Sequence, residues 1–97
     1  MPWYSVQIAV VGSPPEVSKE AVPAIQEELE ARAYLRRPRA SWDAGRGWLV
    51  VQVEDELEDS MFETAELRLH DDLSDVVSAC IVDWPDFDLH VLDVTEV

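Results

Sequence analysis

Two histidines and the carboxylates around them are the residues of this chain that are best suited to chemistry. His70 is followed by Asp71 and Asp72, and Asp75 lies one helical turn beyond Asp71. Oxygen-rich groups of this kind can hold Mg²⁺ or Ca²⁺, and Asp71 and Asp75 share a helix face at an i, i+4 spacing. His70 and Asp72 diverge from that face, and no glycine-bearing calcium loop accompanies them. We therefore expect solvated helix surface and no metal, with Asp71 and Asp75 as weak candidates.

His90 is the second candidate for chemistry. It falls on the predicted last strand, where Gln7, Gln52 and Asp88 could surround it and general acid-base work is conceivable. Neither histidine has a cysteine or another histidine at a zinc-ligand spacing. The sequence also has no nucleophile elbow, phosphate loop or dinucleotide fingerprint. We expect no cofactor and no catalytic residue, and enzyme activity stays an open question that leans toward no.

Negative charge is concentrated in the second half of the chain. Residues 54–97 hold fifteen Asp and Glu against one Arg, whereas residues 1–53 hold six against six, and the net charge is −14. Nucleic-acid binding relies on neutralising phosphates with cations, so this composition argues against it. A basic protein is the partner that the charge favours, and the expected acidic partner surface consists of Glu54, Asp55, Glu56, Glu58, Asp59, Asp71, Asp72 and Asp75.

The acidity has a second possible origin. The chain has one Lys, six Arg and no Asn, a bias typical of GC-rich coding or of a salt-adapted proteome. Under that interpretation the charge reflects solubility in the source organism rather than a partner. The sequence leaves both explanations open, and it does not indicate whether the acidic segments converge on one surface.

Length and cysteine content bound the organisation of the protein. Ninety-seven residues predict one domain, 1–97, with a single modest core. The only cysteine, Cys80, cannot form an internal disulfide and is expected to be a small buried hydrophobic residue. No apolar run has the length of a signal peptide or a membrane span. We therefore expect a cytoplasmic protein.

Hydrophobic periodicity predicts the elements that position these residues. Residues 3–11 alternate as a strand. Ser13 and Glu16 form a helix-start pattern, but Pro23 inside a helix would remove a hydrogen bond, so we expect the first helix to begin near Val22 and to end near Arg36. Ser18 is a competing start.

The second half of the chain adds a hairpin, a helix and a strand. Residues 39–43 and 47–54 are predicted to pair, and Ser60 begins a helix. The buried stripe of that helix is expected at Met61, Ala65, Leu69, Leu73, Val76, Val77 and Cys80. Residues 87–94 form the last strand. The order predicts an α+β fold of the ferredoxin-like βαββαβ type, a four-stranded antiparallel sheet with two helices on one face.

This arrangement leaves the second face of the sheet unusually apolar. Burying one Trp removes about 150 to 250 Å² from water, so exposed Trp residues need a cover. The expected interface residues on this face are Trp3, Trp42, Trp48, Val50, His90 and Leu92. We expect a second copy of the chain to cover them, because twofold homodimers are the commonest assembly. Shielding by the tail or a loop of the same chain is the alternative.

Two classes of function follow from these surfaces. The first is a non-enzymatic interaction or regulatory module, homodimeric through the open sheet face, that binds a basic protein. The second is a small-molecule-binding protein or enzyme of the dimeric α/β-barrel kind, with a pocket near Trp48 and His90.

Overall fold

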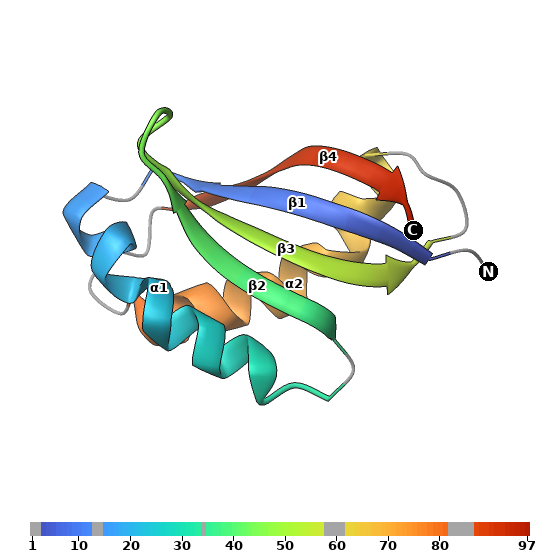
Figure 1. Ribbon diagram of the computed structural model, residues 1–97, viewed down its shortest axis with the longest axis horizontal. Coiled ribbons are helices and arrows are strands. Elements are labelled where there is room, and N and C mark those ends of the chain that lie inside the picture. The colour runs from blue at the N-terminus through green and yellow to red at the C-terminus, as the bar shows by residue number, and fades with distance from the viewer. Residues whose placement is uncertain (1–2, 13–14, 34, 58–61, 82–86) are drawn as a thin grey trace.

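The computed structural model of the chain describes residues 3–12, 15–33, 35–57, 62–81 and 87–97. Its elements follow in the order β1 (Trp3–Val11), α1 (Pro15–Glu30), β2 (Arg36–Asp43), β3 (Trp48–Glu56), α2 (Phe62–Cys80) and β4 (Asp88–Glu96). The strands form one antiparallel sheet in the order β2-β3-β1-β4 (Figure 1). The predicted α+β class, the sequence of elements and the antiparallel sheet are therefore confirmed.

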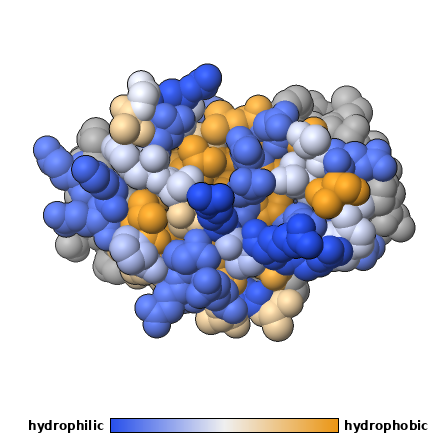
Figure 2. All heavy atoms as spheres, viewed as in Figure 1, coloured by the Kyte–Doolittle hydropathy of each residue, from blue (hydrophilic) through white to orange (hydrophobic). Residues whose placement is uncertain are grey.

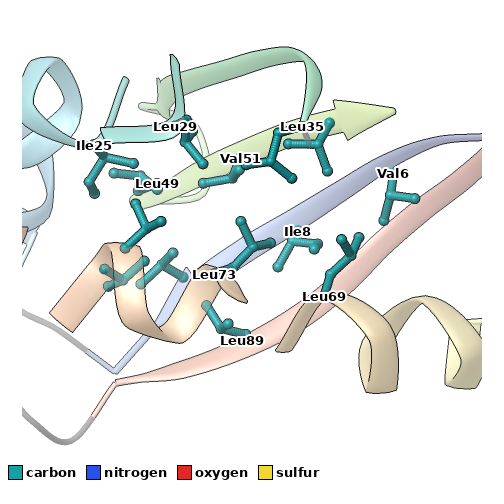
Figure 3. Packing of buried hydrophobic residues seen from close by; sticks show 14 of the residues in the cluster. Val6, Ile8, Ile25, Leu29, Leu35, Leu49, Val51, Leu69, Leu73 and Leu89 are labelled. Atoms are coloured by element: carbon teal, nitrogen blue, oxygen red, sulfur yellow. The ribbon is translucent and has the colours of Figure 1, made fainter. Parts of the chain in front are cut away.

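Both helices pack on the same face of the sheet. Alternate strand residues, among them Val6, Ile8 and Leu49, join Leu29 of α1 and Leu73 of α2 in one buried cluster (Figure 3). α1 lies against β2 and β3, whereas α2 lies against β4. Burying a side chain of this size stabilises the fold by about 1.5 to 3 kcal/mol. No helix formed by the described residues lies over the other face of the sheet, which we call the open face.

The first helix differs from the prediction at both ends. α1 begins at Pro15 and contains Pro23, so the start expected near Val22 is wrong. The helix stops at Glu30 instead of Arg36, and the Arg32 guanidinium donates a hydrogen bond of 2.7 Å to the carbonyl oxygen of Glu28. That contact satisfies one of the carbonyl groups that every helix end leaves without a partner. The chain is then free to turn into β2.

The edge strand β2 is three residues longer than expected because it begins before a bulge. Arg36 pairs with Glu54, and the register shifts before Arg39. Arg37 lies within this bulge with φ +47°, a left-handed conformation that is unusual for a residue with a Cβ. Gln26 of α1 supports the bulge, since its amide donates to the Pro38 carbonyl and accepts from the Ala40 N–H. α1 therefore holds the outer edge of the sheet in place.

The hairpin between β2 and β3 and the helix α2 follow the predicted pattern. The N–H of Gly47, at φ +72°, donates to the Asp43 carbonyl at 2.7 Å. On α2, five residues of the predicted stripe are buried: Ala65, Leu69, Leu73, Val76 and Val77. Cys80 is half-buried against the core, and Ser60 and Met61 lie outside the described residues. Neither helix is apolar enough over sufficient length to cross a bilayer, within the residues that the structure describes.

Candidate functional site

The open face is built from side chains that alternate with the core residues of each strand. Strand register places them in rows that run across the sheet from β2 to β4. The central row is Arg39, Gln52, Gln7 and Asp93, and the next row is Ser41, Val50, Ala9 and His90. Each row is therefore polar at the two edge strands. In Figure 2, which views the sheet from the side away from α2, hydrophobic patches are separated by hydrophilic groups.

A buried ion-pair cluster occupies one end of the open face. The Glu54 side chain is 7% exposed, and its two carboxylate oxygens lie 3.5 Å from Arg36 Nη2 and 3.3 Å from Arg37 Nε. Arg36 also stacks on Trp3, with its guanidinium carbon 4.1 Å from the ring centroid. The bulge in β2 makes this possible, because it turns two consecutive arginines toward one carboxylate. Trp3 is thus covered partly by an arginine of its own chain.

The opposite end of the open face contains Trp48. The Arg46 guanidinium carbon lies 5.7 Å from the Trp48 ring centroid. The indole Nε1 is buried and has no hydrogen-bond partner among the described residues, which costs about 1 to 3 kcal/mol for a polar group. Arginines therefore cover both tryptophans in part, a form of shielding that the sequence analysis did not consider.

Strand register places two of the predicted interface residues, Trp42 and Leu92, differently from the prediction. Trp42 pairs with Leu49 and packs against the core, so its side chain does not belong to the open face. The register between β1 and β4 shifts between Gln7 and Ile8, and Leu92 is the extra residue of β4. Strict alternation therefore stops at Leu92. Trp3, Trp48, Val50 and His90 lie on the open face, where their role in an interface stays a prediction.

His90 does not have the surroundings that were predicted for it. It lies on the edge strand β4 beside Ala9, and β1 separates it from Gln52 on β3. Its side chain is 59% exposed, and its Nε2 lies 3.3 Å from an oxygen of Asp88. Of the predicted neighbours of His90, Asp88 is present. Gln7 is not opposite His90, because Gln7 pairs with Asp93. A solvated imidazole with a single carboxylate neighbour is poorly placed for acid-base chemistry.

The predicted acidic partner surface is only partly exposed. Glu54 is wrong as a member of it, because the carboxylate is buried between Arg36 and Arg37. The Asp55 side chain is 17% exposed, and its carboxylate accepts a hydrogen bond of 2.8 Å from Arg68 Nε. Glu56 and Asp72 are half-buried, and Asp71 and Asp75 are exposed. Glu58 and Asp59 lie outside the described residues.

Exposed carboxylates gather instead on α2 and the neighbouring strand β4. We call the acidic side the five residues Glu66, Asp71, Asp75, Asp88 and Glu96. α2 packs against β4, and the five carboxylates are distributed over the exposed surfaces of these two elements. No arginine or lysine forms an ion pair with them within the described parts of the chain. His70 and His90, at 3.6 Å from Asp71 and 3.3 Å from Asp88, are their only nearby ionisable nitrogen donors in those parts.

No metal site forms from the described residues. None of the His, Cys, Asp and Glu side chains there make a group of three that could hold an ion. Asp71 is 98% exposed, so its carboxylate is free to remain hydrated.

The charge pattern of the central row on the open face was not predicted from the sequence. Arg39 lies at one end of this row and Asp93 at the other, each on an edge strand and each exposed. Arg39 has no ion-pair partner among the residues that the structure describes. Gln52 donates a hydrogen bond of 2.9 Å to the Ser5 hydroxyl and holds the middle of the face together. The polar positions Arg39, Ser41 and Asp43, which alternate with Ala40 and Trp42, were the available signal.

The chain was compared with protein-family models, curated proteins and solved structures, and none of the three comparisons found a match. Its class is therefore defined by the fold and its surfaces: an α+β domain with an open sheet face and an acidic side.

Proposed function

We propose that this chain is a small non-enzymatic interaction module of the ferredoxin-like type, which binds a basic polypeptide through its acidic side. The strand order β2-β3-β1-β4, with both helices contributing to one core, supports the ferredoxin-like assignment. The cytoplasm is the expected compartment, because the single thiol of Cys80 needs no oxidising environment.

One observation carries the proposal: four of the seven cations pair with other carboxylates of the chain, whereas no cation pairs with the carboxylates of the acidic side among the described residues. Arg36 and Arg37 contact Glu54, Arg32 contacts Glu28, and Arg68 contacts Asp55. The field outside α2 and β4 is therefore negative and uncompensated by the described cations. Such a field accelerates association with a basic partner and weakens as salt rises.

Matched charge variants test whether this surface, rather than the net charge, binds a basic partner. The first variant is Glu66→Gln/Asp71→Asn/Asp75→Asn on α2. The control is Glu16→Gln/Glu20→Gln/Glu27→Gln, which removes the same charge from exposed positions of α1. Binding of a fluorescent oligoarginine peptide is measured by anisotropy at low and high salt.

We expect the α2 variant to bind the peptide about tenfold more weakly than the native chain, since rim charges each contribute modestly to association. The α1 control should retain most of the native affinity. Equal losses in the two variants would show that only net charge matters, and this result would contradict the proposal.

Binding of a small anionic molecule on the open face is a second candidate function. A shallow depression there is lined by Gln7, Arg39, Ser41, Trp42, Asp43, Ala44, Val50 and Gln52, so that it contains one arginine and one carboxylate. Arg39 is the side chain that could pair with a carboxylate or phosphate. A panel of anionic metabolites that changes tryptophan fluorescence in the native chain, and not in Arg39→Ala, would favour this candidate over the first.

A further inference from the structure

The open face has opposite charges at its two edges. Its central row begins with Arg39 on β2 and ends with Asp93 on β4, and the two glutamines Gln52 and Gln7 lie between them. Adjacent strands are about 4.8 Å apart, so these edge positions are about 14 Å apart across the sheet. From β2 to β4, the side chains of this row are therefore positive, neutral, neutral and negative.

This order of charges is complementary to itself under one particular twofold rotation. An axis that runs parallel to the strands, midway between β3 and β1, places β2 of one copy over β4 of the other. Arg39 then faces the Asp93 position of the other copy, and Gln52 faces the Gln7 position. In the next row, Val50 meets Ala9 and Ser41 meets His90. A twofold axis across the strands would instead place Arg39 over Arg39.

We propose that a second copy of this chain covers the open face, with the twofold axis parallel to the strands and Arg39 of each copy paired with Asp93 of the other. Val50, which is half-buried on this face, supplies the apolar part of the interface, whereas Ala9 beside it is already fully buried within one chain. This inference does not depend on a basic partner, because the acidic side lies outside the central row.

The area of the face is sufficient for a specific but modest dimer. Three strands of nine residues and one of eight cover about 19 Å by about 30 Å, so two copies bury about 1,100 Å² together, slightly more than the roughly 1,000 Å² expected of a specific interface. Facing sheets pack about 10 Å apart, a gap that an arginine and an aspartate can bridge. We expect a dimer that dissociates on dilution.

Charge reversal at the two ends of the row gives a test specific to this geometry. Arg39→Asp alone places two carboxylates opposite each other, and Asp93→Arg alone places two guanidinium groups opposite each other. When the two variants are mixed, a heterodimer regains two attractive pairs, one between the two reversed residues and one between the native Asp93 and the native Arg39. Sedimentation velocity over a dilution series measures the association of the native chain, of each variant and of the equimolar mixture.

The native chain should sediment at high concentration as a species of twice the 11.0 kDa chain mass. Each variant alone should associate at least tenfold more weakly, and the mixture should recover most of the native association. Lys19→Asp and Glu27→Arg are the controls, because they make the same charge changes at exposed positions of α1. These controls and their mixture should behave like the native chain, and circular dichroism confirms that every variant folds.

Three results would overturn the proposal. The native chain could remain monomeric at every concentration, which would leave the open face without a second copy. The mixture could associate no better than either variant, or Arg39→Asp could strengthen self-association, and both outcomes would exclude the proposed axis.

Discussion

At the scale of single residues, the Glu54 cluster shows how a buried carboxylate depends on its partners. Glu54 is 6% exposed as a residue, whereas the side chains of Arg36 and Arg37 are 46% and 78% exposed. Losing the arginines leaves a buried charge without compensation. Losing the carboxylate instead leaves two cations that water can solvate. The three residues are therefore unequal in their effect on stability.

We predict that Arg36→Ala/Arg37→Ala lowers the free energy of unfolding by about 3 to 5 kcal/mol, whereas Glu54→Gln lowers it by about 1 kcal/mol. Urea unfolding followed by far-UV circular dichroism measures both values. Equal losses, or a larger loss for Glu54→Gln, would mean that the carboxylate is solvated in the native protein.

Cys80 is a described residue whose titration the structure perturbs. Partial burial raises the pKa of the thiol, Glu28 raises it further, and Arg32 opposes the change. Because the folded pKa lies above the unfolded one, the associated stability is fully present below the ordinary value of 9.0 and is lost as pH rises through the folded pKa. The thiolate, which is the reactive form, is thus disfavoured in the native state.

We predict that iodoacetamide alkylates Cys80 more slowly in the folded chain than in the urea-unfolded chain at pH about 8, because the thiolate fraction and access are both reduced. Glu28→Gln should raise the folded rate, since it removes a charge that raises the pKa. Mass spectrometry of timed samples gives the rates. A folded rate equal to the unfolded one would contradict the prediction.

At the scale of elements, Pro23 is the residue that made α1 difficult to predict. It occupies the interior of the helix Pro15–Glu30 and cannot donate the hydrogen bond that this position normally forms. The helix persists because Ala21, Ile25 and Leu29 are buried against the sheet. Tertiary packing here outweighs the local cost of proline.

We predict that Pro23→Ala raises the free energy of unfolding by about 1 to 3 kcal/mol, because alanine restores the hydrogen bond and removes the ring clash. The position is exposed, so no core contact is lost. Thermal and urea unfolding of the two chains give the difference. No gain in stability would indicate that α1 bends at Pro23 in a way that the core requires.

The elements that sequence alone predicted well are those with regular hydrophobic periods. The alternation from Trp3 to Val11 gave both limits of β1, and the three- and four-residue spacing in α2 identified most of its buried stripe. β2 was harder to predict, because its bulge is set by long-range pairing of Arg36 with Glu54. A local pattern cannot reveal a partner eighteen positions away, and for the same reason the burial of Glu54 was missed.

At the scale of the whole molecule, the distribution of charge is better defined than the total of −14 suggested. Part of the acidity is neutralised at Glu54 and Asp55, and exposed carboxylates remain on α2 and β4. The arginines of β2 lie at the opposite edge of the sheet. The sequence indicated how much charge there is, but only the sheet order indicated which charges are neighbours.

The central claim is that the acidic side binds a basic polypeptide, and an NMR titration tests it most directly. Oligoarginine peptide is added to the ¹⁵N-labelled chain at low salt, and amide shifts are followed residue by residue. We expect saturable shifts at Glu66, Asp71, Asp75, Asp88 and Glu96 that disappear at high salt, with little change at the α1 carboxylates Glu16, Glu20 and Glu27. Shifts of equal size on α1, or no shifts at all, would contradict it.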